Sequence, residues 1–295
     1  MDTITHTLIG LTINGSVKKE NLPLNLKKSI FFATLTGSQI PDIDIVLQLT
    51  ERGRIMYQMW HRGLSHSLFM APIWALLIYL ICYLLWKVKD IKVFLVALLC
   101  VSLHIGFDAL NTWGTGLFEP FSTKRVSIGI ISIVDFVLWI IMLIGFIITK
   151  VMKSYPKYRV WHYVWLAIIL HISFQFFQGQ IIYNEAKLLY DNTAISANFI
   201  PGHFKVIGKS GNKIEIYSKT IFSNKKNKII LESMEAVDLT PLLTKNPKAA
   251  VLFNWSPFVV IYEDENEIGI YDPRFYQDDS SFLREYIKKT ENHDK

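Results

Sequence analysis

Histidine and aspartate side chains recur in the apolar N-terminal part of this 295-residue chain, where ionisable groups are costly and therefore suggest function. The candidates are His6, Asp42, Asp44, His61, His66, His104 and Asp108. His104 and Asp108 stand four residues apart, so one helical turn would place an imidazole and a carboxylate on the same face. Such a pair could bind one metal ion or bridge two.

Two aspartates need a break in the helix to reach the same place. Asp42 and Asp44 are two residues apart and cannot share one face of a regular helix. Pro41 would interrupt the helical hydrogen bonds just before them and let their carboxylates turn inward. We therefore expect Asp42 to bind metal and Asp44 to support it or to act as a general base.

A short segment with two histidines opens the third apolar run. His61 and His66 are five residues apart, which excludes a single helix face. Gly63 permits a turn between them, after which Ser65 would cap the next helix and leave His66 in its first turn. Both rings could then reach one centre. Arg62, which lies between them, is a natural partner for a phosphate oxygen.

Other polar residues carry weaker signals. Asp2 and His6 repeat the four-residue spacing, so Asp2 would bind metal or orient the His6 ring. Asp135 is either a ligand or one half of a structural ion pair, and His162 and His171 more simply pair with neighbours. The candidate phosphate-binding residues besides Arg62 are Asn111, Thr112, Lys124 and Arg125.

Six apolar segments would position these residues as a helical bundle in the cell membrane. They are Ile4–Val17, Ile30–Leu49, Leu68–Trp86, Val93–Leu110, Ile130–Thr149 and Val160–Tyr183. Lysines in the loops after the first, third and fifth segments indicate that these loops are cytoplasmic. If the segments alternate in direction, the histidines and aspartates all lie at outward ends, at one membrane depth. Residues 1–3 lack the basic start of a signal peptide, so we expect none.

The C-terminal part has the pattern of a β-rich protein. Lys213–Tyr217 and Phe258–Tyr262 alternate with the period of a strand. Asp264–Glu267 is typical of a hairpin turn and precedes another short β-rich run, Ile268–Tyr271. The last amphipathic stretch, Ser280–Lys289, is predicted to be helical.

The distribution of charge separates these two parts. Only 19% of the residues are charged, against about 25% in soluble proteins, and charges are sparse between residues 65 and 182. We expect a membrane all-α bundle of about six helices over residues 1–183, followed by a small soluble β-rich (α+β) domain over 184–295. The bundle topology would place this domain outside the cytoplasm. Much of the net charge of +6 lies in loops beside apolar segments, so it does not indicate nucleic-acid binding.

The ligand types restrict the metal and the reaction. Histidine with carboxylate suits zinc, manganese or iron, and it argues against calcium or a thiolate centre. Cys82 and Cys100 lie inside apolar runs and are expected to pack rather than to bind metal. The ligands suffice for two ions, expected to be zinc, which could activate water and clamp a displacement at phosphorus. No His-Glu-x-x-His motif of metalloproteases occurs.

These features favour a metal-dependent hydrolase of phosphoesters at the depth of the lipid headgroups, with phospholipids or lipid-linked phosphates as substrates. A metal transporter, a metal sensor or a regulatory protein could use the same ligands. A transporter needs polar groups along the whole membrane depth, whereas these cluster at one end, so we rank it lower. A protein partner of the C-terminal domain is not identified by any motif.

Five motifs in order resemble those of the YdjM/YfhP-type membrane-bound metal-dependent hydrolases. They are Met1–Thr7 (MDTITHT), Gly37–Asp44 (GSQIPDID), His61–Ser67 (HRGLSHS), His104-x-x-x-Asp108 and Asn111–Thr115 (NTWGT). The resemblance covers about the first 180 residues. It implies a multi-pass inner-membrane protein, and some members of the family are linked to the LexA regulon.

A more distant similarity is to zinc-dependent phospholipase C, an α-helical enzyme with several zinc ions. The shared feature is an early His, an Asp, a later His and a His-x-x-x-Asp in similar order. That family continues with His-x-x-x-Glu, whereas His171 in this chain is followed four residues later by Gln175. The similarity therefore implies two metal ions more clearly than a third.

Overall fold

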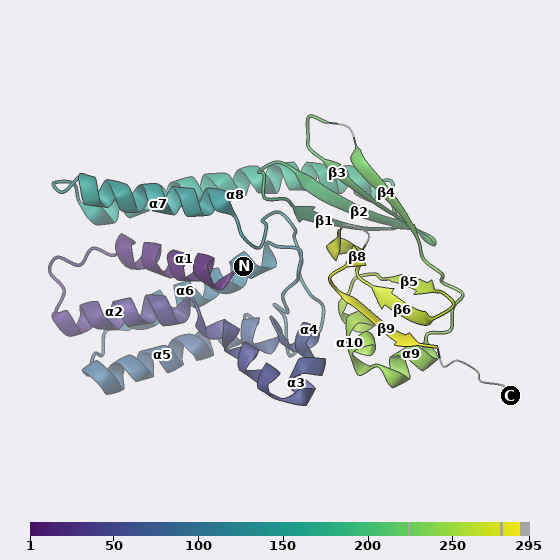
Figure 1. Ribbon diagram of the computed structural model, residues 1–295. Coiled ribbons are helices and arrows are strands. Elements are labelled where there is room, and N and C mark those ends of the chain that lie inside the picture. Colours follow the sequence, from purple (N-terminus) through teal and green to yellow (C-terminus); the bar gives the residue numbers. More distant parts are fainter. Residues whose placement is uncertain (224, 278–279, 290–295) are drawn as a thin grey trace. The chain divides into compact units, whose positions relative to one another are not determined.

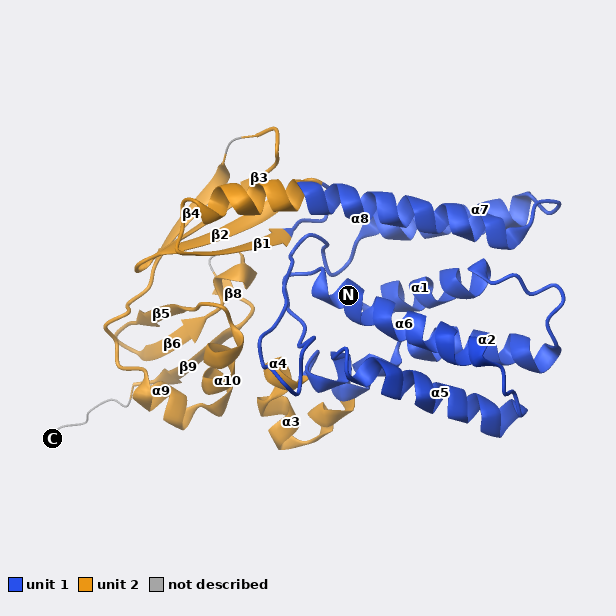
Figure 2. Ribbon diagram, turned by 180° about the vertical axis from the view of Figure 1, so that it is seen from behind, with its two compact units in different colours: residues 1–45, 61–177, 197–201 blue, residues 46–60, 178–196, 202–295 orange. Residues whose placement is uncertain are grey.

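The computed structural model divides into two compact units (Figures 1 and 2). It describes residues 1–223, 225–277 and 280–289. Unit 1 comprises residues 1–45, 61–177 and 197–201, and unit 2 comprises residues 46–60, 178–196 and 202–295. The predicted order of a helical region with apolar spans followed by a β-rich region is confirmed.

The N-terminal region consists of α-helices and two 3₁₀ helices, which are labelled η. These are α1 (Thr3–Ser16), α2 (Leu24–Gly37), η1 (Ile40–Leu49), α3 (Glu51–Ile55), α4 (Tyr57–Trp60), η2 (Leu64–His66), α5 (Met70–Trp86), α6 (Ile91–Ala109), α7 (Phe136–Val151) and α8 (Lys157–Lys187). Figure 1 shows α2, α5 and α6 side by side, and fully buried Ala33, Ala75 and Ala97 belong to their common core. These small side chains let the three helices approach closely.

Two of these helices, α6 and α8, are each long and apolar enough to cross a membrane. Two bent pairs also qualify when each is taken as one span: α2 with η1, bent by 51°, and residues 57–66 with α5, bent by 67°. The described residues therefore contain two to four candidate spans. Helices lie in all six predicted segments, but the second segment combines the end of α2 with η1, and the fifth becomes helical only at Phe136. Six crossings remain a prediction.

Gly10 lies where α1 packs closely against the end of α2. A Cβ atom at Gly10 would lie 2.5 Å from Oγ of Ser38 and 2.7 Å from the carbonyl oxygen of Thr34. We expect Gly10→Val to lower the free energy of unfolding by about 1–3 kcal/mol, because backbone atoms of α2 cannot easily move away. Thermal unfolding of the detergent-purified protein would measure this.

Gly106 provides the matched control, since a Cβ atom at this helical glycine would meet nothing within 4 Å. Gly106→Ala should leave the unfolding temperature unchanged or raise it, because alanine favours the helix. Equal unfolding temperatures for Gly10→Val and wild type would contradict the close helix contact.

The described residues of unit 2 form three small sheets and several short helices. The strands are β1 (Asn192–Ala197), β2 (Phe204–Ser210), β3 (Lys213–Lys219) and β4 (Lys226–Glu232) in one sheet, β5 (Val260–Glu263), β6 (Glu267–Tyr271) and β9 (Arg284–Lys288) in a second, and β7 (Tyr276–Gln277) with β8 (Ser280–Ser281) in a third. The helices are α9 (Thr240–Lys245), α10 (Pro247–Trp255) and η3 (Pro273–Phe275), and α3 and α4 pack against α10. Buried Ile207, Ile214 and Val260 belong to one core.

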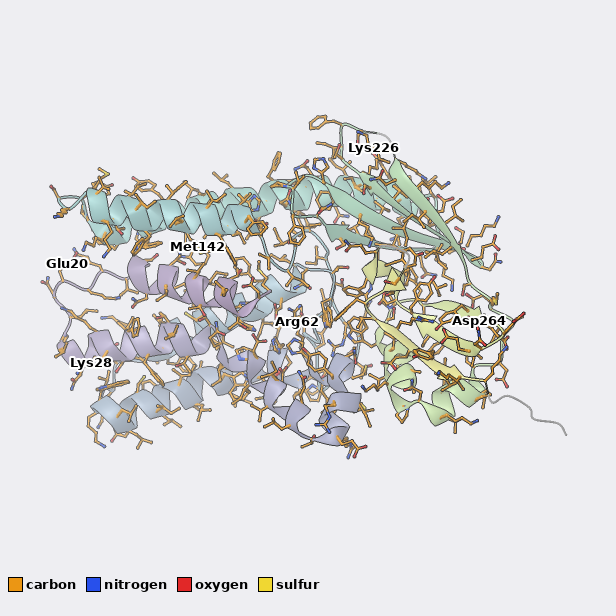
Figure 3. All side chains as sticks on the ribbon, viewed as in Figure 1. Glu20, Lys28, Arg62, Met142, Lys226 and Asp264 are labelled. Atoms are coloured by element: carbon orange, nitrogen blue, oxygen red, sulfur yellow. The ribbon has the colours of Figure 1, made fainter. Side chains whose placement is uncertain are left out.

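The predicted strands of unit 2 are confirmed at β3, β5 and β6, and Asp264 lies at the turn between β5 and β6 (Figure 3). Its N–H donates to the carbonyl of Glu267 at 3.0 Å, and its carboxylate accepts the N–H of Asn266. The helix predicted at Ser280–Lys289 is wrong, because the chain forms β8 and then β9, which pairs antiparallel with β6. Pairing with a neighbouring strand decided the conformation of this short stretch, which sequence periodicity alone could not do.

Candidate metal centre

Four segments of unit 1 bring the predicted histidines and aspartates together. The start of α1 supplies His6, η1 supplies Asp42 and Asp44, residues 61–66 supply His61 and His66, and the last turns of α6 supply His104 and Asp108. Pro41 lies at the start of η1, where the chain bends after α2 as predicted. After the bend, Asp42 lies 3.6 Å from His104 of α6, and Asp44 lies beside His61 and Ser65.

One group of side chains has the composition of a metal site. Asp42, His66, His104 and Asp108 each offer a ligand atom, and these atoms all lie within 4.8 Å of one another. Nε2 of His66 lies 3.1 Å from Nε2 of His104 and 3.2 Å from Oδ1 of Asp42. Ligand atoms around one tetrahedral zinc ion are about 3.3 Å apart, so these separations suit a single ion.

Both imidazoles of this group have a hydrogen-bond partner at Nδ1, on the side of the ring away from the cluster. Nδ1 of His104 lies 2.8 Å from the carbonyl oxygen of Ser38, and Nδ1 of His66 lies 2.9 Å from Oγ of Ser65. Partners of this kind fix a ring so that its other nitrogen faces the metal. The prediction that Ser65 caps the third long helix is wrong, because Ser65 lies in η2 and α5 begins only at Met70. Sequence pattern did not reveal the orienting role of Ser65.

A second group shares Asp42 with the first. Asp42, Asp44 and His61 also offer ligand atoms within 4.8 Å of one another. Nδ1 of His61 lies 3.0 Å from Oδ1 of Asp44. Oδ2 of Asp44 accepts the hydroxyl of Ser65 at 2.7 Å and the backbone N–H of Arg62 at 3.1 Å. Two adjacent groups with a common carboxylate could hold two ions.

His6 contacts the first group without belonging to it. Its Nε2 lies 3.2 Å from Oδ1 of Asp108, and its ring stacks on His104 with the ring centres 3.7 Å apart. The side chain of His6 is fully buried.

Two of the less certain aspartates, Asp2 and Asp135, cap helices. Asp2 accepts the N–H of Thr5 at the start of α1, and Asp135 accepts N–H groups in the first turn of α7. Asp135 also lies 2.9 Å from Nε2 of His171, which fits the structural ion pair. His162 lies 3.1 Å from the carbonyl oxygen of Ser16, as expected for a histidine that pairs with a neighbour.

The candidate phosphate-binding residues differ in their contacts and in their exposure to solvent. The buried guanidinium of Arg62 has its Nε 3.3 Å from Oδ2 of Asp108, and its Nη1 donates to Oδ1 of Asn111 at 3.0 Å. Arg125 donates to the backbone carbonyls of His61 and Gly114 and so holds the loop in place. Thr112 is buried and Lys124 is exposed. The α-amino group of Met1 also contacts Asp108.

The helices and the His/Asp cluster together define a helical membrane protein whose buried cluster could hold a metal ion. The chain belongs to the YdjM inner membrane protein family, whose model matches residues 1–182 and so includes every residue of the cluster. It is 36% identical over 139 residues to the uncharacterized protein YfhP of Bacillus subtilis (strain 168). That match covers 46% of this chain and 42% of YfhP, and no solved structure matches the chain.

Proposed function

We propose that this protein is a membrane-bound metal-dependent hydrolase of phosphoesters. The observation that carries the proposal is the convergence of Asp42, His66, His104 and Asp108, whose ligand atoms lie within 4.8 Å of one another. No hydrogen bond reaches Oδ2 of Asp108 among the described residues, although Nε2 of His66 and Nε of Arg62 both lie 3.3 Å away. A buried carboxylate oxygen in such surroundings suits a bound cation.

The residues fit two divalent ions, which we propose to be zinc. His6, Asp42, His61, His66, His104 and Asp108 would hold them. Bound metal would supply an activated water and stabilise negative charge on the phosphoryl group. Asp44 is held by Ser65 and His61, and we assign it the role of orienting these groups and accepting a proton. Arg62 would stabilise a phosphoryl oxygen, since a buried guanidinium is a strong donor to such an anion.

The partial exposure of Asp42, and of apolar side chains near it, supports the proposal of an amphiphilic substrate. The side chain of Asp42 is 24% exposed, whereas those of His66, His104 and Asp108 are fully buried. The 3₁₀ helices η1 and η2, which carry Asp42 and His66, expose apolar side chains, among them Ile43 at 52% and Leu64 at 46%. Exposed apolar groups beside a polar site are typical of contact with lipid. A phospholipid or a lipid-linked phosphate is therefore the substrate class that we propose.

The arrangement in the membrane is part of the same proposal. Residues 1–183 would form the membrane-bound hydrolase domain, and residues 184–295 would form a soluble domain on the outer side of the inner membrane. The lysine-rich loops after α1, α5 and α7 support this orientation.

The test combines metal analysis with an activity assay on one sample of detergent-purified protein. We expect about two zinc ions per chain and hydrolysis of a phosphodiester or of phospholipid in mixed micelles. Treatment with a chelator should lower the activity at least about 100-fold, and added zinc should restore it.

Each other outcome has a defined meaning. Bound metal without turnover of any phosphoester would favour a regulatory, sensing or transport role for the same site. Protein without metal, even after incubation with zinc, manganese or iron, would overturn the proposal and leave the cluster as a polar network.

A further inference from the structure

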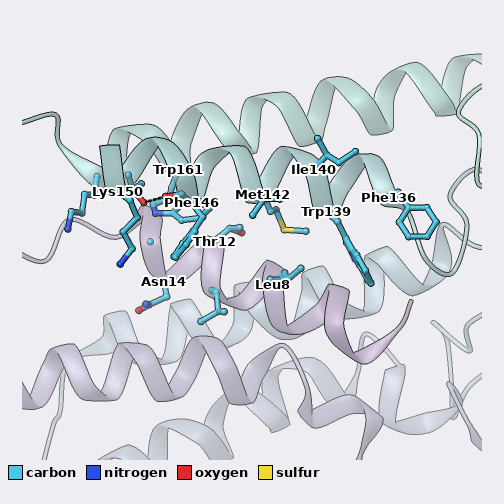
Figure 4. A pocket seen from close by; sticks show the side chains of 15 residues that line it. Leu8, Thr12, Asn14, Phe136, Trp139, Ile140, Met142, Phe146, Lys150 and Trp161 are labelled. Atoms are coloured by element: carbon cyan, nitrogen blue, oxygen red, sulfur yellow. Dashed lines mark hydrogen bonds between the residues drawn. The ribbon is translucent and has the colours of Figure 1, made fainter. Parts of the chain in front are cut away.

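A long apolar groove lies in unit 1 between α1, α7 and the start of α8, apart from the metal centre. Its volume is about 990 Å³, and Figure 4 shows side chains from all three helices lining it. The apolar lining includes Leu8, Leu11, Trp139, Met142, Leu143 and Phe146. The two helices α1 and α7 begin at the same end of the unit, where the N–H of Asp2 donates to the carbonyl of Ile133.

The polar lining residues lie mainly at one end of this groove. Figure 4 shows Asn14 and Lys150 at that end, and Phe136 and Trp139 at the other. Lys157, the first residue of α8, also lines the groove. Lys150 and Lys157 are both exposed, and Lys19 donates to the amide oxygen of Asn14. No carboxylate lines the groove in the part of the chain that the structure describes. An apolar channel with a cationic end is complementary to an anionic amphiphile.

The groove is longer than the hydrocarbon part of one leaflet of a bilayer. The lining residues of α7 extend from Phe136 to Lys150, a rise of about 21 Å along the helix. The hydrocarbon part of one leaflet is about 15 Å thick. A lipid could therefore bind with an acyl chain along α7 and its headgroup at Lys150.

We propose that this groove binds one anionic glycerophospholipid, with its phosphate between Lys150 and Lys157 and an acyl chain along Met142 and Trp139. The bound lipid is distinct from any substrate, because the cationic end lies about 12 Å along α1 from His6, at the end away from the metal centre. The proposal does not depend on the hydrolase activity.

The experiment is native mass spectrometry of the full chain, purified in a mild detergent and incubated with phosphatidylglycerol or with phosphatidylcholine. We expect wild type to retain one phosphatidylglycerol per chain and little phosphatidylcholine. The double variant Lys150→Gln/Lys157→Gln should retain at least about tenfold less phosphatidylglycerol. Leu143→Trp, which fills the groove and keeps both lysines, should also lose the lipid.

The matched control is Lys89→Gln/Lys153→Gln, which removes two exposed lysines that do not line the groove. It should retain phosphatidylglycerol as wild type does. Equal retention by wild type and the Lys150→Gln/Lys157→Gln variant, or equal retention of both lipids, would overturn the proposal. A dimer without lipid would overturn it too, in favour of a second copy on this face. Lipid retention by chelator-treated protein would separate this site from the metal centre.

Discussion

His66→Ala is expected to remove bound metal and to lower phosphoester hydrolysis at least about 1,000-fold. Nε2 of His66 lies within 3.3 Å of ligand atoms from His104, Asp42 and Asp108, so this nitrogen is central to the first group. After its loss, His104 is left 3.6 Å from both Asp42 and Asp108, and His6 is left beside Asp108. The measurement is metal content by mass spectrometry together with the rate of hydrolysis on the same sample.

His162→Ala is the matched control for this variant. His162 lies on α8 and contacts the carbonyl oxygen of Ser16, so its removal should leave metal content and activity near wild type. Correct folding of both variants can be compared through their unfolding temperatures. A His66→Ala protein that retains wild-type metal content would refute the assignment of the first group.

Spacing within one segment predicted part of this centre. His104 and Asp108 were placed on one face of a helix, and the structure has Nε2 of His104 3.6 Å from Oδ2 of Asp108. The alternation of the apolar segments also predicted that the ligands of different helices would meet. Both predictions rest on regular geometry, in which four residues make about one turn and helices reverse direction at each loop.

Spacing along the chain could not predict which aspartates cap the helix that follows them. Asp2 and Asp135 immediately precede helices, where an aspartate commonly accepts N–H groups of the first turn. The pairing of Asp135 with His171 and the contact of His6 with Asp108 join residues far apart in the chain. Such contacts depend on how helices pack, and a single sequence contains no direct signal for them.

The second large effect is expected from substitution of Arg62, whose guanidinium would either stabilise a phosphoryl oxygen or position Asp108. Arg62→Gln is expected to lower kcat by about 100- to 1,000-fold while metal content stays near wild type. A guanidinium is a cation and does not bind zinc, but in a buried site it stabilises charge that develops on a phosphoryl oxygen. The buried position of Arg62 beside Asp108 places this charge at the centre.

The alternative is that Arg62 only positions Asp108, since its Nε lies 3.3 Å from Oδ2 of that residue. In that case Arg62→Gln would weaken metal binding by about 10- to 100-fold, and excess metal would restore kcat. Metal titration followed by kcat and KM at saturating metal distinguishes the two roles. Arg62→Lys should recover only part of the activity because it lacks the forked donor. Arg159→Gln, which changes an exposed arginine on α8, should leave both quantities unchanged.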